Sequence, residues 1–207
     1  MAELTFYTNP MSRGQIARWM LEEAGADYDQ VILGYADTMK AADYLAINPM
    51  GKVPAIVHCG NVVTEGAAIC AYLADAFPDA SLAPRDDAER AAYYRWLFYA
   101  AGPVEAAVTD RSLGVVLTAE QAPMVGYGAY DTVVDVLDRE IAGKQYVCGD
   151  RFTAADVYFG SQIIWGIGFG SLPRRDSFQA YADRLTARPA HQKARKIDND
   201  LIAAAKS

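Results

Sequence analysis

The spacing of apolar and polar residues changes along the chain, and it predicts a small mixed sheet followed by a helical half. In the first part, short runs of strand-forming residues bounded by turn signals alternate with stretches whose apolar residues recur at helical spacing. The predicted strands cover residues 4–8, 28–33, 53–58 and 61–64. The predicted helices run over residues 11–24, 37–46 and 65–77. The order β-α-β-α-β-β-α requires a mixed sheet with helices packed on it.

The pattern changes at segment 77–84, which contains two prolines and has a composition that suits an interdomain linker. Beyond it, strand signals nearly vanish and long alanine-rich stretches with helical periodicity follow. The sequence therefore predicts two domains. Residues 1–78 form an α/β domain, residues 86–207 form an all-helical domain, and residues 79–85 link them.

Composition and charge narrow the possible partners. The chain has 207 residues, of which 52% are hydrophobic and 22% are charged, as in ordinary globular proteins. Its formal net charge of -7 would repel a phosphate backbone, so neither nucleic acid nor an anionic membrane is an expected partner. The first residues lack the features of a signal peptide, and no apolar run reaches the length of a membrane span. The sequence thus predicts a soluble, cytoplasmic protein.

Cysteine and histidine are too sparse and scattered for a disulfide framework or a zinc motif. The three cysteines, Cys59, Cys70 and Cys148, are widely spaced and include no C-x-x-C pair. We expect them to be buried, reduced thiols. The two histidines, His58 and His191, leave little material for a metal centre, and His58 is expected to have a structural role on a strand. No metal is therefore expected.

Ser12 follows the first predicted strand, where a helix is expected to begin. With Gln15 three positions later, it matches the Ser-x-x-Gln pattern of a capping box, which is a purely structural role. A hydroxyl at the positive end of a helix can also donate to a thiolate and lower the pKa of a thiol from its usual value of about 8.5. The two roles are compatible, and the segment alone leaves both open.

A second candidate element is the tripeptide Lys52-Val53-Pro54, at the start of the third predicted strand. Proline is tolerated there because its missing N–H lies outside the ladder. A trans bond before Pro54 is the ordinary expectation, and Lys52 alone is an ordinary solvated charge. A cis bond would instead turn the backbone N–H and C=O of Val53 outward, toward a peptide-like ligand.

The third candidate element is Glu65-Gly66, at the junction of the fourth strand with its helix. Free N–H groups at a helix start bind carboxylates, and the neighbouring Glu65 can hold an ammonium group, so the pair fits an α-amino acid. The alternative is that Glu65 only supplies a favourable charge in the first helical turn.

These three elements, in this order and followed by an all-helical half, resemble the glutathione transferase family over essentially the whole chain. The features resemble cytosolic, bacterial enzymes of the serine type, with similarities to the theta and beta classes. The resemblance implies that the first domain is thioredoxin-like and that Ser12 stabilises the glutathione thiolate. The residues that it assigns to the rest of glutathione are Lys52, Val53, Pro54 in a cis bond, Glu65 and Gly66.

One departure and one further match qualify the resemblance. The family places a hydroxyl residue where Gly66 stands, so the resemblance implies that glutathione binding lacks one hydrogen bond to the γ-glutamyl end. If nothing compensates, the loss weakens binding by about 1.5–3 kcal/mol. In the helical half, Thr153 and Asp156, preceded by Phe152, resemble the capping box and hydrophobic staple that begin a core helix of the family.

The resemblance implies a transferase that conjugates glutathione to small hydrophobic electrophiles, as in detoxification, and that forms a homodimer. Met11 and Phe98 are candidate contacts for the electrophile in a hydrophobic pocket. A glutathione-dependent dehalogenase, isomerase or peroxidase would use the same site, and a non-catalytic ligand-binding protein is the alternative of another class. Thiol-disulfide exchange is disfavoured because no cysteine occupies the position of Ser12. The glycines of 166–170 have the wrong spacing for a dinucleotide fingerprint, so no nucleotide is expected.

Overall fold

The computed structural model describes residues 3–205, which form two compact units. One unit comprises the chain up to Ala83 together with the residues from Ala187 onward, and the other comprises Pro84–Thr186. The division falls inside the predicted linker 79–85. The predicted helical domain ran to residue 207, whereas the last helix packs with the α/β unit in the structure. The last helix belongs to the α/β unit because its side chains contact those of the first helix.

The first unit is built on a four-stranded sheet with the strand order β2-β1-β3-β4. Strands β1 and β2 are parallel, and the other two pairings are antiparallel. Each strand lies within one residue or two of its predicted range, and the observed bounds are β1 Leu4–Thr8, β2 Asp29–Ile32, β3 Ala55–His58 and β4 Asn61–Thr64. Together with the helices of this unit, the sheet confirms the predicted thioredoxin-like fold class.

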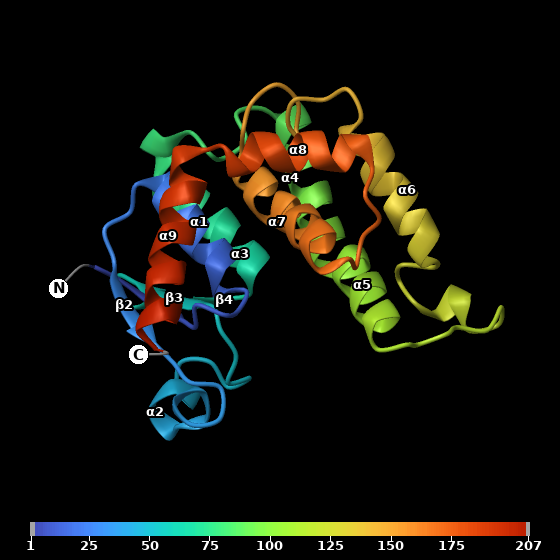
Figure 1. Cartoon of the computed structure of the whole chain (residues 1–207). Coiled ribbons are helices and arrows are strands. Elements are labelled where there is room, and N and C mark those ends of the chain that lie inside the picture. Colours follow the sequence, from blue (N-terminus) through green and yellow to red (C-terminus); the bar gives the residue numbers. More distant parts are fainter. Residues whose placement is uncertain (1–2, 206–207) are drawn as a thin grey trace. The chain divides into compact units, whose positions relative to one another are not determined.

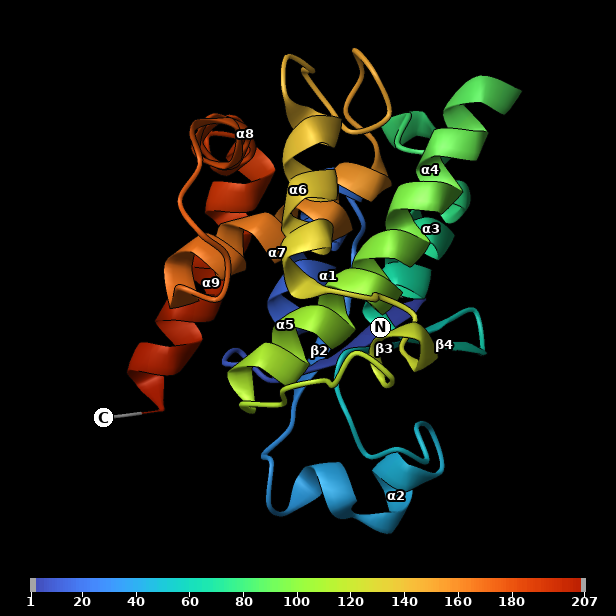
Figure 2. The same cartoon turned by 90° about the vertical axis from the view of Figure 1, so that its right-hand side faces the viewer.

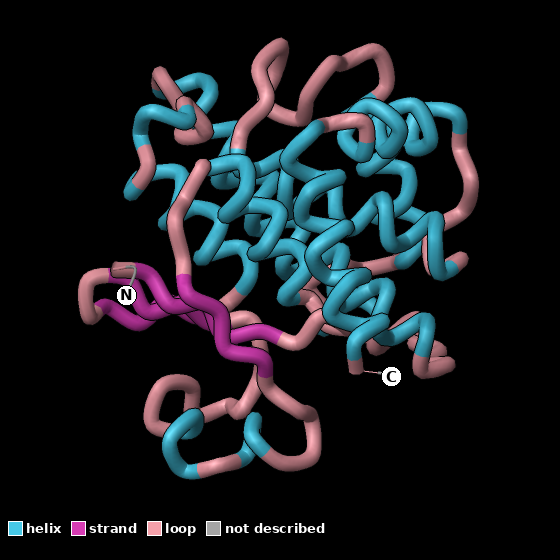
Figure 3. The backbone as a smooth tube through the Cα atoms, turned by 60° about the vertical axis from the view of Figure 1, so that its left-hand side comes forward, coloured by secondary structure: helices cyan, strands magenta, loops and turns pink. Residues whose placement is uncertain are grey.

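The helices of this unit are α1, α2, α3 and α9. Helix α1 packs against both α3 and α9, and Figure 3 shows α2 with its loops on the opposite side of the sheet. The ring of Tyr44 on α2 lies 5.6 Å from that of Tyr7 on β1. Their bounds are α1 Gly14–Ala24, α2 Ala42–Leu45, α3 Gly66–Ala76 and α9 Pro189–Ala204, with 3₁₀ turns at Thr38–Lys40 and Pro78–Ala80.

Two helix boundaries differ from the predictions. Helix α1 begins at Gly14 and not near Met11, because the preceding residues form a turn. The helix predicted over 37–46 is instead a 3₁₀ turn followed by the single turn of α2, since Ala41 between them is extended (ψ 148°). The end of α1 agrees with its prediction, because Gly25 adopts the left-handed conformation (φ 63°) of a C-cap.

The second unit is all-helical, as predicted. Helix α7 is central: most of its residues are buried, and it packs against α4 and α8, while α6 contacts α5 and α8 (Figures 1 and 2). The bounds are α4 Asp87–Tyr99, α5 Glu105–Ser112, α6 Tyr130–Ile141, α7 Ala154–Phe169 and α8 Asp176–Thr186, with a 3₁₀ turn at Ala122–Met124.

A π-helical turn at Ala100–Val104 joins α4 to α5. It contains Pro103, which lacks the N–H that an α-helical ladder needs. The π-turn accommodates Pro103 between the two helices. Single π-turns of this kind are frequent at functional sites.

The predicted capping box at the start of α7 is confirmed. The Thr153 N–H donates to Asp156 Oδ2 at 2.8 Å, and both halves of the box are present. The second carboxylate oxygen of Asp156 accepts from the Val147 N–H at 2.8 Å and from the Tyr181 hydroxyl at 2.6 Å. This fully buried carboxylate therefore ties together the start of α7, the preceding loop and α8.

Candidate functional site

The sheet register brings the three candidate segments to one edge of the sheet. Tyr7 on β1 pairs with Ala55 on β3, and Ala55 pairs with Thr64 on β4. The loop that carries Ser12 leaves the end of β1, the Val53-Pro54 dipeptide enters the start of β3, and Glu65-Gly66 leaves the end of β4. Because β3 is antiparallel to both neighbours, these ends all lie at the same edge.

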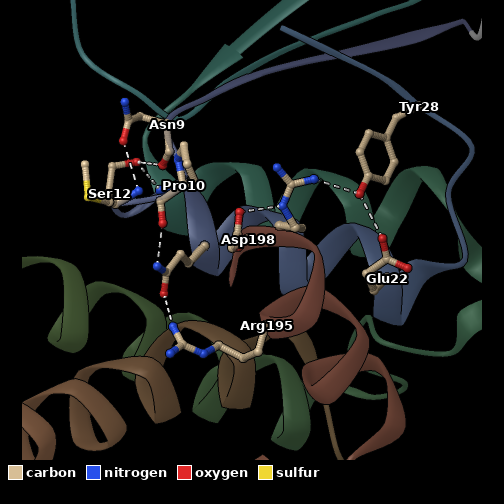
Figure 4. A network of polar contacts seen from close by, with 11 residues as sticks. Asn9, Pro10, Ser12, Glu22, Tyr28, Arg195 and Asp198 are labelled. Atoms are coloured by element: carbon tan, nitrogen blue, oxygen red, sulfur yellow. Dashed lines mark hydrogen bonds and ion pairs between the residues drawn. The ribbon is translucent and has the colours of Figure 1, made fainter. Parts of the chain in front are cut away.

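Ser12 lies in a turn just before α1, half-buried, with its hydroxyl engaged on both sides (Figure 4). The hydroxyl donates to the Asn9 carbonyl at 2.6 Å and accepts from the Gly14 N–H at 2.9 Å. The predicted capping box does not form. Arg13 is the N-cap residue, and the Gln15 side chain donates to the Pro10 carbonyl at 2.6 Å, away from the Ser12 backbone.

This arrangement defines what the Ser12 hydroxyl can do. The Gly14 N–H fixes the position of the oxygen, and the hydroxyl proton can rotate about the C–O bond. Donation to a bound sulfur requires only that the proton turn away from the Asn9 carbonyl. The backbone N–H groups at the start of α1 lie beside this oxygen and favour negative charge there.

Asn9 organises the loop around Ser12, a role that the turn signal Asn9-Pro10 did not reveal. Its Oδ1 accepts from the Met11 N–H at 2.9 Å, and its Nδ2 donates to the Leu33 carbonyl at 2.7 Å. The Tyr35 hydroxyl donates to the Met11 carbonyl at 3.1 Å. The backbone of Met11 is thus fixed while its side chain remains 64% exposed.

The Val53-Pro54 bond is cis, as the family resemblance implied, so the trans bond expected from the sequence alone was wrong. Val53 is half-buried, and the Lys52 side chain is exposed. Val53 packs against an apolar cluster that lies beside the sheet and consists of Leu33, Met39, Tyr44 and Ala55.

Three side chains that the sequence did not single out hold the backbone leading to Val53. The Lys52 carbonyl accepts from the Tyr44 hydroxyl at 2.5 Å and from Asn48 Nδ2 at 2.8 Å. Lys40 Nζ donates to the Gly51 carbonyl at 2.8 Å. Burial raises the pKa of Tyr44, which keeps this phenol protonated and able to donate. A signal for these roles is hard to find in the sequence, because all three donors bind main-chain oxygens.

Glu65 adopts φ 64° and ψ 120°, an uncommon conformation for a residue with a side chain. It directly precedes Gly66, the first residue of α3, and its side chain is exposed. Residues in sparsely populated backbone conformations cost about 1–3 kcal/mol and cluster at functional sites. The conformation therefore supports a binding role for Glu65 beyond that of a favourable first-turn charge.

Phe98 lies on α4 in the second unit. Its side chain is 71% exposed, next to the ring of Tyr94, whereas Tyr93, Trp96 and Leu97 belong to the core. Phe98 is thus the most exposed aromatic side chain of α4, and Tyr94 beside it is 42% exposed.

Three buried cysteines were expected from the sequence, and only Cys70 is fully buried. Cys70 is buried, which raises the pKa of its thiol, and burial raises the pKa of the half-buried Cys148 to about 12. Cys59, expected to be buried, is exposed in the turn between β3 and β4.

His58 lies at the end of β3, as predicted, stacked on Phe77. Among the described helices, none has the length and apolarity required to cross a membrane.

Comparisons with known proteins agree with this geometry. The family model "Glutathione S-transferase, N-terminal domain" matches residues 2–75. Glutathione S-transferase GstA of Escherichia coli O157:H7 is 31% identical over 84% of this chain and 88% of its own length. Disulfide-bond oxidoreductase YghU of Escherichia coli K12 is 28% identical over 94% of this chain and 75% of its own. The crystal structure of a theta class glutathione S-transferase from Xanthomonas axonopodis pv. citri, with glutathione bound, is 30% identical, with a TM-score of 0.75 over 94% of this chain and 97% of its own.

Proposed function

This chain belongs to the glutathione S-transferase family, and we propose that it conjugates the glutathione thiolate to hydrophobic electrophiles, with Ser12 stabilising the thiolate. The observation that carries the proposal is the convergence of three segments on one sheet edge, with the Ser12 oxygen held there by the Gly14 N–H. The glutathione bound to the Xanthomonas relative supports the same ligand for this chain.

The proposed contacts follow the chemistry of the tripeptide. The backbone of Val53, next to the cis Pro54, pairs with the cysteinyl residue, and Lys52 meets the glycyl carboxylate. Glu65 holds the ammonium group of the γ-glutamyl end, whose carboxylate binds the N–H of Gly66 at the start of α3. The unusual backbone conformation of Glu65 supports this assignment.

The proposed chemistry needs no further protein nucleophile. The thiol loses its proton to solvent, and the Ser12 hydroxyl donates to the resulting sulfur anion, which lowers the thiol pKa. The sulfur then forms a bond to an electrophilic carbon while a leaving group departs with the electron pair, or while the electrons move to an adjacent acceptor. The protein contributes orientation and charge stabilisation. The exposed apolar side chains of Met11 and Phe98 are each proposed to contact a hydrophobic electrophile.

A second candidate is a glutathione-dependent disulfide reduction, which the similarity to YghU supports. Here the thiolate of one glutathione attacks a disulfide and expels one thiolate, which leaves a mixed disulfide. A second glutathione thiolate attacks the glutathione sulfur of the mixed disulfide, which forms glutathione disulfide and expels the second thiolate, so no protein cysteine is needed. A dehalogenase, an isomerase, a peroxidase and a non-catalytic glutathione-binding protein remain alternatives at the same site. We also propose the homodimer and the cytoplasmic, detoxifying role implied by the family.

The experiment measures glutathione affinity, conjugation of an aryl halide and the pKa of the bound thiol for the wild type, Ser12→Ala and the control Ser112→Ala. Ser112 is exposed on α5, far along the chain from the site. Because a hydrogen bond to a charged group contributes about 1.5–3 kcal/mol, we expect Ser12→Ala to reduce kcat/KM by about 10- to 100-fold and to raise the thiol pKa. Ser112→Ala should change neither. Full turnover and an unchanged thiol pKa in Ser12→Ala would overturn the mechanism, and glutathione binding without turnover on any electrophile would favour the non-catalytic alternative.

A further inference from the structure

Glu3, His58 and Cys59 come together at the end of the sheet opposite to Ser12. Leu4, at the start of β1, pairs with His58 at the end of β3, and the Cys59 N–H donates to the Glu3 carbonyl at 3.0 Å. Figure 3 shows the start of β1 and the β3–β4 turn at the same end of the sheet. The carboxylate, imidazole and thiol each offer one ligand atom, and these atoms lie within 4.8 Å of one another.

We propose that Glu3, His58 and Cys59 form a binding site for a zinc ion, with solvent in the fourth coordination position. A sulfur, a nitrogen and an oxygen ligand match the donor set of zinc, and sites with three protein ligands leave one position open. The thiol and imidazole disfavour magnesium and calcium, which prefer oxygen ligands throughout. The proposal is independent of the proposed glutathione chemistry, because the two sites lie at opposite ends of the sheet.

The distances are close to those of a metal site. With zinc–ligand bonds of about 2.3 Å to sulfur and about 2.1 Å to oxygen, a tetrahedral angle separates the two ligand atoms by roughly 3.6 Å. Cys59 Sγ lies 3.5 Å from Glu3 Oε2. Two of the three ligand atoms therefore already have the separation that the ion requires, and small side-chain rotations bring in the third.

The ring of His58 is held in a manner typical of metal ligands. Its Nδ1 lies 3.0 Å from the Tyr72 hydroxyl, and its ring stacks on Phe77 with the centroids 5.6 Å apart. If Nδ1 carries the proton and donates it to the Tyr72 oxygen, Nε2 keeps the lone pair that binds a metal. Metal-bound histidines commonly have such a partner on the other ring nitrogen, which orients the ring.

Cys59 occupies a position where packing offers no reason for a cysteine. It is exposed in the tight turn between β3 and β4, with φ 51°, followed by Gly60 with φ 80°. Such turns favour asparagine, aspartate or glycine, because both central residues have positive φ. A cysteine there costs backbone free energy without burying its side chain. A ligand role accounts for the thiol at this position.

No metal was expected from the sequence, because histidine is scarce and the cysteines form no C-x-x-C pair. Glu3 is 55 positions away from His58, so no local motif joins them. Only the pairing of β1 with β3 brings the carboxylate to the other two side chains. A bound ion would cross-link the start of β1 to the β3–β4 turn. Because it binds only the folded state, zinc should also raise the thermal stability of the protein.

The test titrates the full-length, tag-free, reduced protein with zinc by calorimetry, and with cobalt while recording the thiolate-to-cobalt absorption band. We expect one zinc per chain, and at least about tenfold weaker binding in Cys59→Ser and in Glu3→Gln. The controls are Cys148→Ser, which leaves the same number of thiols, and Glu120→Gln, which removes an exposed carboxylate elsewhere. Both controls should bind like the wild type.

The cobalt band assigns the sulfur, because it should disappear in Cys59→Ser and persist in Cys148→Ser. A Tyr72→Phe variant, which removes only the partner of His58 Nδ1, should weaken zinc binding less than the ligand variants do. Zinc binding that is absent in the wild type, or that is equally strong in Cys59→Ser, overturns the proposal. Conjugation of the aryl halide should be unchanged in Cys59→Ser, so failure of the metal site and failure of the proposed function are separate results.

Discussion

Arg18 on α1 donates through Nε to Asp198 Oδ1 on α9 at 2.8 Å, and both side chains are only 1% exposed. The guanidinium also donates to the Tyr28 hydroxyl at 3.1 Å, which donates in turn to Glu22 at 2.8 Å (Figure 4). Burial, followed by the hydrogen bond to Glu22, raises the pKa of Tyr28 to about 12. Arg18 Nη2 and Asp198 Oδ2 are buried atoms that have no hydrogen-bond partner among the described residues. This buried pair fixes the last helix to the first one.

Removal of one charge from the pair should destabilise the first unit strongly. We expect Asp198→Ala to lower the free energy of unfolding by about 3–5 kcal/mol, because it leaves the Arg18 charge buried and unpaired. A double variant, Arg18→Met with Asp198→Leu, should recover most of the loss, since it removes both charges and keeps apolar volume. Denaturant titration of the full-length chain measures both effects.

The same helix offers a control for that prediction. Lys196 and Asp200 form an ion pair on α9 whose side chains are 76% and 66% exposed. Asp200→Ala should therefore cost less than about 1 kcal/mol. If Asp198→Ala were no more destabilising than Asp200→Ala, the Arg18 pair would not be what fixes α9.

A second contact from α9 reaches the Ser12 loop. Arg195 Nη1 donates to Gln15 Oε1 at 2.5 Å, and Gln15 Nε2 donates to the Pro10 carbonyl at 2.6 Å. Gln15→Ala should therefore release the backbone on one side of Ser12. We expect a fall in kcat/KM of about 3- to 10-fold for the proposed reaction, with a smaller change in unfolding free energy than Asp198→Ala gives.

A double-mutant cycle distinguishes this tether from two independent effects. Arg195→Ala and Gln15→Ala should be non-additive in kcat/KM, because each breaks the same chain of contacts. Lys193→Ala is the matched control. Lys193 lies on the same helix but pairs with Glu22 at 2.6 Å, and so takes no part in the contacts from Arg195 through Gln15 to Pro10. Additive effects, or an equal loss of activity in Lys193→Ala, would show that the contacts from Arg195 through Gln15 to Pro10 do not support the Ser12 loop.

Local sequence patterns predicted the strands well, because short runs of strand-forming residues bounded by turn residues depend little on distant parts of the chain. They also located Ser12 and the dipeptide Val53-Pro54 at strand ends, from which the edge site follows once the register is known. The roles of Asn9 and Tyr44 could not be predicted, because these side chains bind main-chain carbonyls. The packing of α9 depends on Asp198 meeting a residue 180 positions away, which no local periodicity encodes.

Gly14 provides a test of how tightly the start of α1 is packed around Ser12. A Cβ added to Gly14 would lie 2.0 Å from Thr8 Oγ1 and 3.0 Å from Ser12 Oγ. Alanine is favoured over glycine in a helix by about 1 kcal/mol, yet here the contact should dominate. We expect Gly14→Ala to destabilise the protein by about 1–3 kcal/mol and to lower the activity that depends on the Ser12 hydroxyl.

Two further variants separate this clash from a general effect of replacing glycine. A Cβ at Gly168, in the last turns of α7, would meet nothing within 4 Å, so Gly168→Ala should be neutral or stabilising by up to about 1 kcal/mol. Thr8 is fully buried and its Oγ1 lacks a hydrogen-bond partner within residues 3–205, so its hydroxyl can be removed without breaking a bond. Thr8→Ala should therefore restore much of the stability lost in Gly14→Ala, because it removes the atom that the new methyl group meets. If the double variant were as unstable as Gly14→Ala alone, contact with Thr8 would not be the reason that a glycine begins this helix.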